Sequence, residues 1–255
     1  PNAVRWRAAW PGPGLHSPFD ETNMKVAPRL AMKLLIASRF VIDGGGATRP
    51  DPGAITEPVD RALVTRLLGV VDEATRAFDA YDYTTALERI EKSFWEFCDD
   101  YLELVKERAY DEQGGPATES AKATLAVALH VQLRLLAPFL PYVTEEVWSW
   151  WQEGSVHHAA WPTAGELAAA EAGDGAILDA VAAALAGIRG AKSQAKVSMR
   201  AEVARAEVVG PAALVAAAES AADDLRKVGK ITGELLFTAQ PDATELTVVA
   251  ELAEE

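Results

Sequence analysis

Residues 133–151, LRLLAPFLPYVTEEVWSWW, constrain the fold of this chain more than any other segment. An apolar run with helical spacing meets Pro138 and Pro141, and proline bars a helix from continuing through it. We expect a second helix to begin at Thr144, whose hydroxyl can accept from free N–H groups of the first turn. The two glutamates that follow suit the positive end of a helix dipole. The segment therefore predicts two helices joined at a proline corner.

Apolar residues recur at helical spacing through most of the chain before this corner. One apolar face with a period of 3.6 residues is typical of helices that pack side by side. Thr56, just before Pro58, and Thr85, three residues before Glu88, are where N-caps are expected. The predicted helices cover residues 21–42, 58–78, 85–112 and 117–137. The third has a predicted buried stripe made of Leu87, Ile90, Phe94, Phe97, Cys98, Tyr101 and Val105.

The pattern changes in the last third of the chain. An alanine-rich helix is expected over 176–196, and short alternating runs then predict strands over 203–209, 231–238 and 245–252, with a helix over 211–227. The turn between the last two strands holds Pro241 and Asp242. We therefore expect a mainly α fold, a helical bundle over 21–165 followed by a small α+β C-terminal unit within 176–255.

Composition limits what this fold can do. The net charge is −14, which argues against nucleic acid as a partner for the surface as a whole. Residues 1–50 are the exception, with seven basic and three acidic side chains. A single cysteine, Cys98, excludes a disulfide framework and indicates a reducing compartment. No apolar run reaches the length of a membrane span, so we expect no membrane association.

Motifs that carry catalysis are missing from the sequence. There is no glycine-rich phosphate loop ending in Lys-Ser/Thr, no HExxH and no CxxC. The four histidines are not arranged as a metal site, and no nucleophile stands with a base and an oxyanion hole. We therefore expect no catalytic residues, no metal and no cofactor within these residues.

The helix expected over 21–42 carries the first candidate binding surface. At 100° per residue, four cations and one aromatic share about a third of its circumference. Such a face can meet phosphates and stack an unpaired base, or it can be an ordinary solvated face whose aromatic lies at the core edge. The pattern leaves both interpretations open. The residues are Lys25, Arg29, Lys33, Arg39 and Phe40.

A second basic stretch lies within residues 186–200, which hold no acidic side chain. Lys192 and Lys196 are four residues apart, on one face of the expected helix, and Arg189 and Arg200 flank them. The stretch is either a second RNA contact or a solvated helix end whose cations suit the helix dipole.

Four segments, together with the proline corner, carry a likeness to a known family. They are residues 2–21 (NAVRWRAAWPGPGLHSPFDE), 24–42 (MKVAPRLAMKLLIASRFVI), 94–106 (FWEFCDDYLELVK) and 192–203 (KSQAKVSMRAEV). In this order they resemble segments of valyl-tRNA synthetases. The corner resembles the anticodon-binding domain of class I aminoacyl-tRNA synthetases in general, and ASRFV and FWEFCDDYLE favour the valine enzymes.

Two positions depart from that family's pattern. Ala27 and Pro28 replace a usual Gly-Arg pair, and Ile36 replaces an asparagine. Pro28 lacks a backbone donor, so it should kink the helix or mark its start. Ile36 lies among the cations where a polar contact to RNA would be expected.

The resemblance implies that the chain is the C-terminal anticodon-binding region of a bacterial-type valine–tRNA ligase. Residues 1–20 would then be a remnant of the segment leading from the catalytic domain. The partner would be tRNA(Val), together with catalytic and editing domains outside these residues. ATP with magnesium would serve the parent enzyme, in the cytoplasm, and we expect a monomer. In this interpretation the cations listed for both surfaces contact phosphates, and Phe40 stacks on an anticodon base.

Two other interpretations stay open. The first is the same domain from an isoleucine-, leucine- or methionine-specific enzyme, since the proline corner does not separate these. The second is a helical protein-interaction scaffold that has kept the fold and lost RNA binding, which the acidic composition, Pro28 and Ile36 favour.

Overall fold

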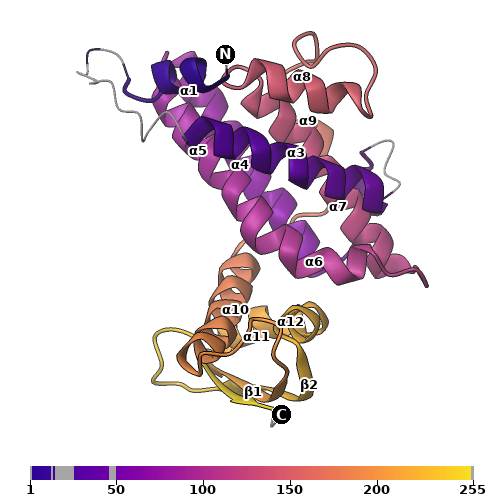
Figure 1. The fold of residues 1–255 in the computed structure, drawn as a ribbon, viewed down its shortest axis with the longest axis vertical. Helices are drawn as coiled ribbons and strands as arrows, with labels where there is room; N and C mark the ends of the chain where they lie inside the picture. Colours follow the sequence, from indigo (N-terminus) through magenta and orange to yellow (C-terminus); the bar gives the residue numbers. More distant parts are fainter. Residues whose placement is uncertain (1, 13, 15–25, 46–49, 254–255) are drawn as a thin grey trace.

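The computed structural model describes residues 2–12, 14, 26–45 and 50–253. It confirms a mainly α-helical chain that ends in a small α+β unit (Figure 1). The helical part precedes α10 in the chain, and its apolar core continues into the C-terminal unit through residues such as Ile177, Leu185 and Leu225. Its elements are α1 (Asn2–Ala9), α3 (Val26–Gly45), η1 (Pro52–Ala54), α4 (Pro58–Asp79), α5 (Tyr83–Glu96), η2 (Phe97–Tyr101), α6 (Leu102–Ala109), α7 (Pro116–Leu136), α8 (Pro141–Ser149) and α9 (Ala164–Leu167).

Helix α7 is the centre of the bundle. Fifteen of its 21 residues are buried, so it has almost no solvent face and other helices must surround it. It contacts α3, α4, α5, α6 and α8. Helix α3 crosses the front of the bundle in Figure 1. The short α1 packs against α3, α5 and α8, and it buries Trp6.

The predicted long helix after residue 85 is one continuous helical path with a π turn inside it. Helix α5 runs directly into the π-helical η2, which runs into α6. A π turn adds one residue per turn and so shifts the face of the helix that meets the core. This is why the neighbours Phe97 and Cys98 are both buried, along with Tyr101. Every residue of the predicted buried stripe is buried.

Three helix starts differ from those expected. Helix α8 begins at Pro141, the first helical position that proline favours, and not at Thr144. Thr144 is buried within the helix, and its hydroxyl donates to the Leu140 carbonyl at 2.9 Å. Helix α4 has Glu57 as its N-cap, one residue later than Thr56.

The third helix start also lies earlier than the capping-box spacing indicated. Asp82 is the N-cap of α5, and its carboxylate accepts from the Thr85 backbone N–H at 3.1 Å. Thr85 is therefore inside the first turn of the helix. The carboxylate is the better cap here because it reaches the free N–H groups from outside the helix.

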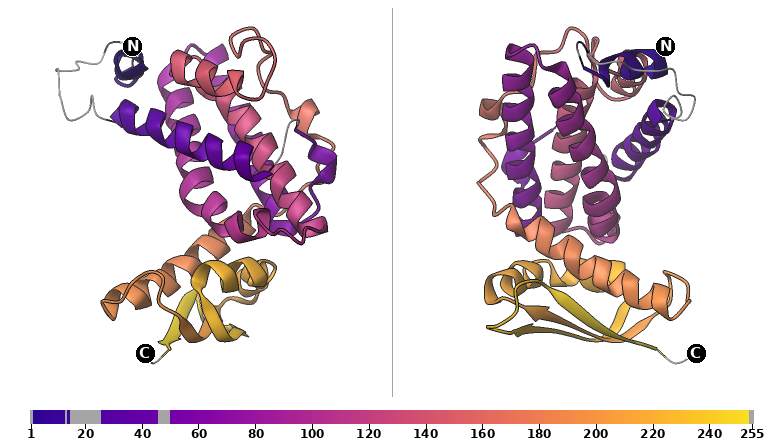
Figure 2. Two further views of the ribbon diagram at one scale, coloured as in Figure 1. Left: turned by 45° about the vertical axis from the view of Figure 1, so that its right-hand side comes forward. Right: turned by 90° about the vertical axis from the view of Figure 1, so that its left-hand side faces the viewer.

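The C-terminal unit places three helices on one face of a three-stranded sheet (Figure 2). Strand β1 lies between the other two, parallel to β2 and antiparallel to β3. The turn at Pro241 and Asp242 therefore connects strands that are not neighbours. The helix expected over 211–227 is two helices. The elements are α10 (Ala176–Gln194), β1 (Val203–Gly210), α11 (Ala212–Glu219), α12 (Ala222–Gly229), β2 (Ile231–Ala239) and β3 (Thr247–Leu252).

A buried ionic network joins this unit to the bundle. The Arg108 guanidinium on α6 donates to both carboxylate oxygens of Asp60 on α4, at 2.7 and 2.8 Å. Its Nε donates to Asp224 on α12, at 3.0 and 3.1 Å. All three residues are at most 7% exposed. Because a buried charge is costly without partners, the junction has a defined arrangement.

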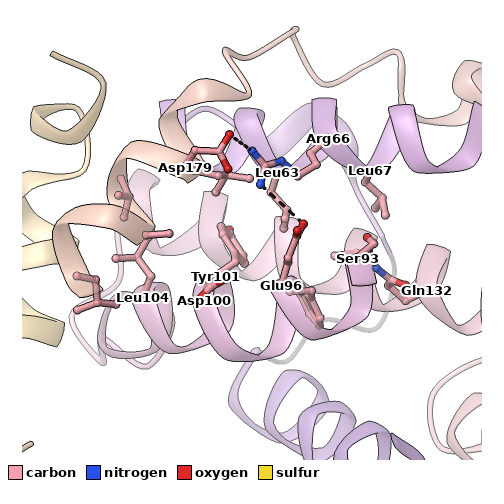
Figure 3. Close-up of a pocket in the computed structure, with 16 residues that line it drawn as sticks. Leu63, Arg66, Leu67, Ser93, Glu96, Asp100, Tyr101, Leu104, Gln132 and Asp179 are labelled. Carbon is pink, nitrogen blue, oxygen red and sulfur yellow. Dashed lines mark hydrogen bonds and ion pairs between the residues drawn. The ribbon is translucent and has the colours of Figure 1, made fainter. Parts of the chain in front are cut away.

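A second contact lies where α10 meets α4 and α5. Arg66 pairs with Asp179 at 2.8 Å and with Glu96 at 3.7 Å (Figure 3). It also donates to the Gly175 carbonyl at 2.9 Å. A pocket of about 90 Å³ lies in this seam. Deep in it, the Gln132 amide donates to the Ser93 hydroxyl at 2.9 Å. The seam links the bundle to the first two turns of α10.

Candidate nucleic-acid interface

Helix α3 has the two faces that its sequence predicted. Leu30, Leu34, Ala37, Ser38 and Val41 are buried against the bundle. Pro28 lies in the first turn of the helix, where its missing N–H would have had no helical partner. It therefore marks the helix start, one of the two outcomes expected.

The outer face of α3 is exposed and carries both basic and apolar side chains. Arg29 and Arg39 are exposed, and neither has an ion pair within the described residues. Between them Met32 is 57% exposed and Ile36 is 60% exposed. Two large apolar side chains at this exposure, one turn apart and between two arginines, make this a mixed surface, on which the arginines can meet phosphates and the apolar side chains keep the protein-interaction interpretation open. Lys25 lies outside the described residues.

Lys33 has a partner that the sequence pattern did not indicate. Its ammonium group lies 2.8 Å from the Asp99 carboxylate, which belongs to the π turn η2. This hydrogen bond raises the pKa of Lys33, against the opposing effect of burial. The positive charge of Lys33 is therefore partly balanced before any RNA arrives, and Arg29 and Arg39 are the more available cations of this face.

Arg39 contacts an aromatic side chain from another helix. Its guanidinium carbon lies 5.5 Å from the ring centroid of Trp150, at the end of α8. The Trp150 indole N–H donates to Glu146 at 3.1 Å. Cation–π contact fixes the arginine above the ring and keeps the guanidinium charge. The proline corner thus supplies a residue that orients Arg39, a role the sequence analysis did not foresee.

Phe40 is partly buried and packs in an aromatic pair. The centroid of the Tyr110 ring lies 4.8 Å from that of Phe40, with the rings tilted by 57°. The ammonium group of Lys106, on α6, lies 5.4 Å from the centroid of the Phe40 ring. Tyr110 is 45% exposed, so it is the more accessible ring of the pair. Sequence reasoning missed Tyr110 because it follows the end of α6 and belongs to no predicted face.

The second basic stretch divides into a buried and an exposed part. Lys192 is 1% exposed, and its ammonium donates to the carbonyls of Met199 and Gly229 at 3.1 and 2.8 Å. Burial, with the nearby charges of Lys230 and Arg189, lowers the pKa of Lys192. Lys192 is therefore a structural residue of the C-terminal unit and is not part of its surface.

The other three members of this stretch are exposed. Helix α10 ends at Gln194, two residues before the expected end, and Lys196 has a left-handed backbone with φ of 57°. Lys196 and Lys192 therefore do not share a helix face, contrary to the prediction. Arg189, Lys196 and Arg200 surround the end of α10, and we call these three residues the α10 patch.

Ion pairing distinguishes these cations from most others in the described part of the chain. On α4 and α5, for example, Arg76 pairs with Asp72 and Arg89 pairs with Glu73. Exposed cations without such pairs are few within the described residues: Arg5, whose guanidinium donates to the Pro138 carbonyl, and Arg29, Arg39, Lys227 and the α10 patch. In a chain with a net charge of −14, unpaired cations on two surfaces indicate places suited to a polyanion.

The described ranges show neither a metal site nor a membrane-spanning helix. They hold no group of three histidine, cysteine or acidic side chains that could bind a metal. None of their helices is both long and apolar enough to cross a membrane. Cys98 is buried, and burial raises the pKa of its thiol to about 12.

The chain matches known proteins in a consistent way. Residues 60–208 match the family described as the anticodon-binding domain of tRNA ligase. The chain is 50% identical over 256 residues to a valine–tRNA ligase of Cutibacterium acnes, an alignment that covers 99% of this chain and 28% of the relative. It is 52% identical over 254 residues to the valine–tRNA ligase of Thermobifida fusca, an alignment that covers 99% of this chain and 28% of that relative.

A third relative, the valine–tRNA ligase of Leifsonia xyli, is 47% identical over 257 residues, covering all of this chain and 30% of its own length. The chain thus spans less than a third of these relatives. A solved leucine enzyme from Agrobacterium radiobacter K84, in a ternary complex with tRNA, has a TM-score of 0.48 and 16% identity, over 67% of this chain and 20% of its own. That likeness is too distant to assign function. The matched family covers more than half of the chain, which therefore belongs to the anticodon-binding domains of tRNA ligases.

Proposed function

We propose that this chain is the anticodon-binding part of a valine–tRNA ligase and that it positions tRNA(Val) through the outer face of α3. Membership of the anticodon-binding family supports the first half, and identity near 50% to valine–tRNA ligases over the whole chain supports valine as the amino acid. The single structural observation that carries the proposal is the pair of unpaired arginines on the exposed face of α3.

Each part of this face has a distinct role in the proposal. Arg29 and Arg39 contact phosphates, and the Trp150 ring holds Arg39 in place. The aromatic pair of Phe40 and Tyr110 offers a ring on which an unpaired anticodon base can stack, worth roughly 1–3 kcal/mol. Lys25 and Lys33 add positive charge, Lys33 less so because Asp99 already pairs with it.

The chemistry of the ligase lies outside these residues in this proposal. Joining valine to tRNA uses ATP with magnesium, and the described residues hold neither a phosphate loop nor a metal cluster for it. The contribution of this chain is geometric. By fixing the anticodon stem-loop it places the distant acceptor end at the catalytic domain, and correct orientation of reactants is itself a large part of catalysis. The cytoplasm is the compartment in which this work would occur.

A binding titration tests the proposal. We expect the purified protein to bind tRNA(Val) more weakly as salt rises, with a log–log slope of roughly −3 to −5 for four to six phosphates. Changing the anticodon should weaken binding, and tRNAs for isoleucine, leucine and methionine should compete poorly. Better competition by one of these would transfer the specificity to that amino acid. No affinity for any tRNA at low salt would contradict the proposal and favour a protein-interaction scaffold.

A further inference from the structure

The α10 patch and the outer face of α3 lie on the same side of the molecule. In the right-hand view of Figure 2, α3 and the C-terminal end of α10 are both toward the right, one in the bundle and one in the C-terminal unit. Both carry exposed cations without ion pairs in the described residues. A single polyanion that passes along this side would therefore meet positive charge at two separate places.

The face of the sheet that the three helices leave uncovered is not suited to bind RNA. Arg205 is there, paired with Glu207, Glu234 and Glu251 at 3.4 to 3.6 Å. Three carboxylates around one guanidinium leave this face net negative, so it repels a phosphate backbone. The C-terminal unit can thus approach RNA with the end of α10 but not with its sheet. Its orientation on the bundle consequently decides whether it can bind at all.

The ionic network at the junction helps to fix that orientation, together with the Arg66 contact and the apolar core that the two units share. Asp60 accepts four hydrogen bonds, from Arg108 twice and from the hydroxyls of Tyr101 and Ser120 at 2.7 and 2.6 Å. Arg108 also donates to the Ala117 carbonyl at 2.8 Å. Asp224 is the member that comes from the C-terminal unit. Because Arg108 must keep both carboxylates to satisfy its donors, the unit cannot rotate on the bundle without leaving buried charge unpaired.

We propose that the C-terminal unit is a second RNA-backbone-binding surface, formed by Arg189, Lys196 and Arg200, and that Arg108 and Asp224 are positioning residues that hold it at a fixed spacing from α3. The inference rests on the proposed function and adds a second contact region and a device that sets its distance. Its ligand is a phosphate backbone outside the anticodon loop, since the two surfaces lie in different units of the protein.

Removing the patch tests the surface. In the variant Arg189→Ala/Lys196→Ala/Arg200→Ala, the log–log salt slope for tRNA(Val) should become shallower by about 2 to 3, at roughly 0.7–0.9 per phosphate. The preference for the correct anticodon should not change. The matched control is Arg76→Ala/Arg89→Ala/Lys92→Ala, which removes three exposed cations that are already ion-paired and should leave the slope unaltered.

The outcomes separate this inference from the proposed function. A wild-type protein that does not bind tRNA removes the proposed function, and the inference with it. A wild-type protein that binds with anticodon preference, combined with an unchanged slope in the patch variant, overturns the inference alone. Equal loss in the patch variant and in the control variant would also overturn it, because net charge and not the patch would then explain binding.

A distance measurement tests whether Arg108 and Asp224 hold the C-terminal unit at a fixed spacing from the bundle. Two spin labels on Glu88→Cys in α5 and Gln194→Cys in α10 report the relation between the units, and Cys98 stays unlabelled because it is buried with a raised pKa. We expect one narrow distance distribution, which Asp224→Ala broadens. The same substitution should make the salt slope shallower, as loss of the patch does, while anticodon preference is kept.

Two further variants serve as a control and as a milder substitution for the distance measurement. Glu107→Gln breaks the exposed pair between Glu107 and Lys230, at the same junction but outside the buried network, and should leave the distances narrow. Asp224→Asn keeps the shape and one acceptor, and should give an intermediate effect if Asp224→Ala does not fold. A narrow, unshifted distribution in both Asp224 variants, or an unchanged salt slope despite broadened distances, would overturn the positioning role.

Discussion

The charged residues at the junction and those on the outer face of α3 form opposite environments within one protein. At the junction, Asp60, Arg108 and Asp224 are buried, and their hydrogen bonds satisfy one another. On α3, Arg29 and Arg39 are exposed and have no carboxylate partner among the described residues. Both regions contain arginine, so residue type does not distinguish them.

The difference shows that the surroundings of a charge indicate its role. A buried charge without partners would cost several kcal/mol, so the junction keeps its charges only as a complete network. An exposed charge costs little, so a cation can stay unpaired on the surface until a ligand arrives. The junction arginine therefore acts on structure, and we expect the α3 arginines to act on binding.

The largest effect should follow from breaking the junction. Arg108→Ala leaves Asp60 fully buried without its main partner, and we expect the free energy of unfolding to fall by about 3–5 kcal/mol. Urea unfolding measures it. Arg29→Ala is the matched control, since an exposed, unpaired arginine should change stability by no more than about 0.5 kcal/mol. Similar losses in the two variants would erase the distinction between the regions.

A smaller effect on the free energy of unfolding should come from His130, a partly buried side chain whose neutral form the fold favours. His130 stacks on Trp148, with centroids 5.0 Å apart, and burial, with the nearby Arg134, lowers its pKa from 6.5 to about 4. The unfolded chain therefore binds a proton more readily, and stability present above pH 6.5 is lost as pH falls toward 4. We expect about 1–2 kcal/mol of this loss, allowing for partial exposure.

The comparison variant for this effect is His130→Gln, which does not titrate. Unfolding in urea at pH 7 and at pH 4.5 gives the change in stability for each protein. The wild-type protein should lose more stability between the two pH values than the variant does. An equal loss would show that His130 is not the group responsible.

Binding, and not stability, should respond when the α3 arginines are removed. For Arg29→Ala/Arg39→Ala we expect the salt slope for tRNA(Val) to become shallower by about 1.5 to 2, from two lost phosphate contacts. Stability should change by less than about 1 kcal/mol. Titration at several salt concentrations, beside thermal unfolding, measures both. Lost stability with unchanged binding would place these arginines in the structural class with Arg108.

The smallest effect should come from the pair of Lys33 and Asp99, which is less buried than the junction network and, unlike Arg29 and Arg39, joins a cation to a carboxylate. Asp99→Asn removes the carboxylate beside Lys33, so the pKa of Lys33 should fall toward its ordinary value. Stability should change by at most about 1 kcal/mol, because the pair is partly exposed. Binding of tRNA(Val) should become tighter, since a cation is released and an acidic group removed. Weaker binding would show that the pair orients Lys33 for RNA.

Local patterns were enough to predict most helices and their buried faces. The stripe from Leu87 to Val105 and the apolar face of α3 follow from spacing alone, because core packing selects apolar side chains at helical intervals. Helix starts were less predictable. Thr144 and Thr85 resemble caps in sequence, but α8 begins at Pro141 and Asp82 caps α5, since a competing start signal stands within three residues of each threonine.

The candidate site was predicted in part. The sequence located the basic face of α3, because its cations recur at helical spacing on one helix. It did not reveal that Asp99 pairs with Lys33, that Trp150 lies by Arg39, or that Tyr110 covers Phe40. These partners come from other helices, and periodicity within one helix carries no information about them.

By itself the sequence determined the helical class, the α+β ending, the likeness to valyl-tRNA synthetases and the cations from which binding surfaces could be made. Only the tertiary structure decided which of those cations are available. The Lys192 side chain is buried and donates to two backbone carbonyls, while Arg189, one turn before it on the same helix, is exposed. Likewise Arg108, Asp60 and Asp224, far apart in the chain, met at one buried point. The physical reason is that helix periodicity is local, whereas burial and charge pairing depend on residues that only the folded chain brings together.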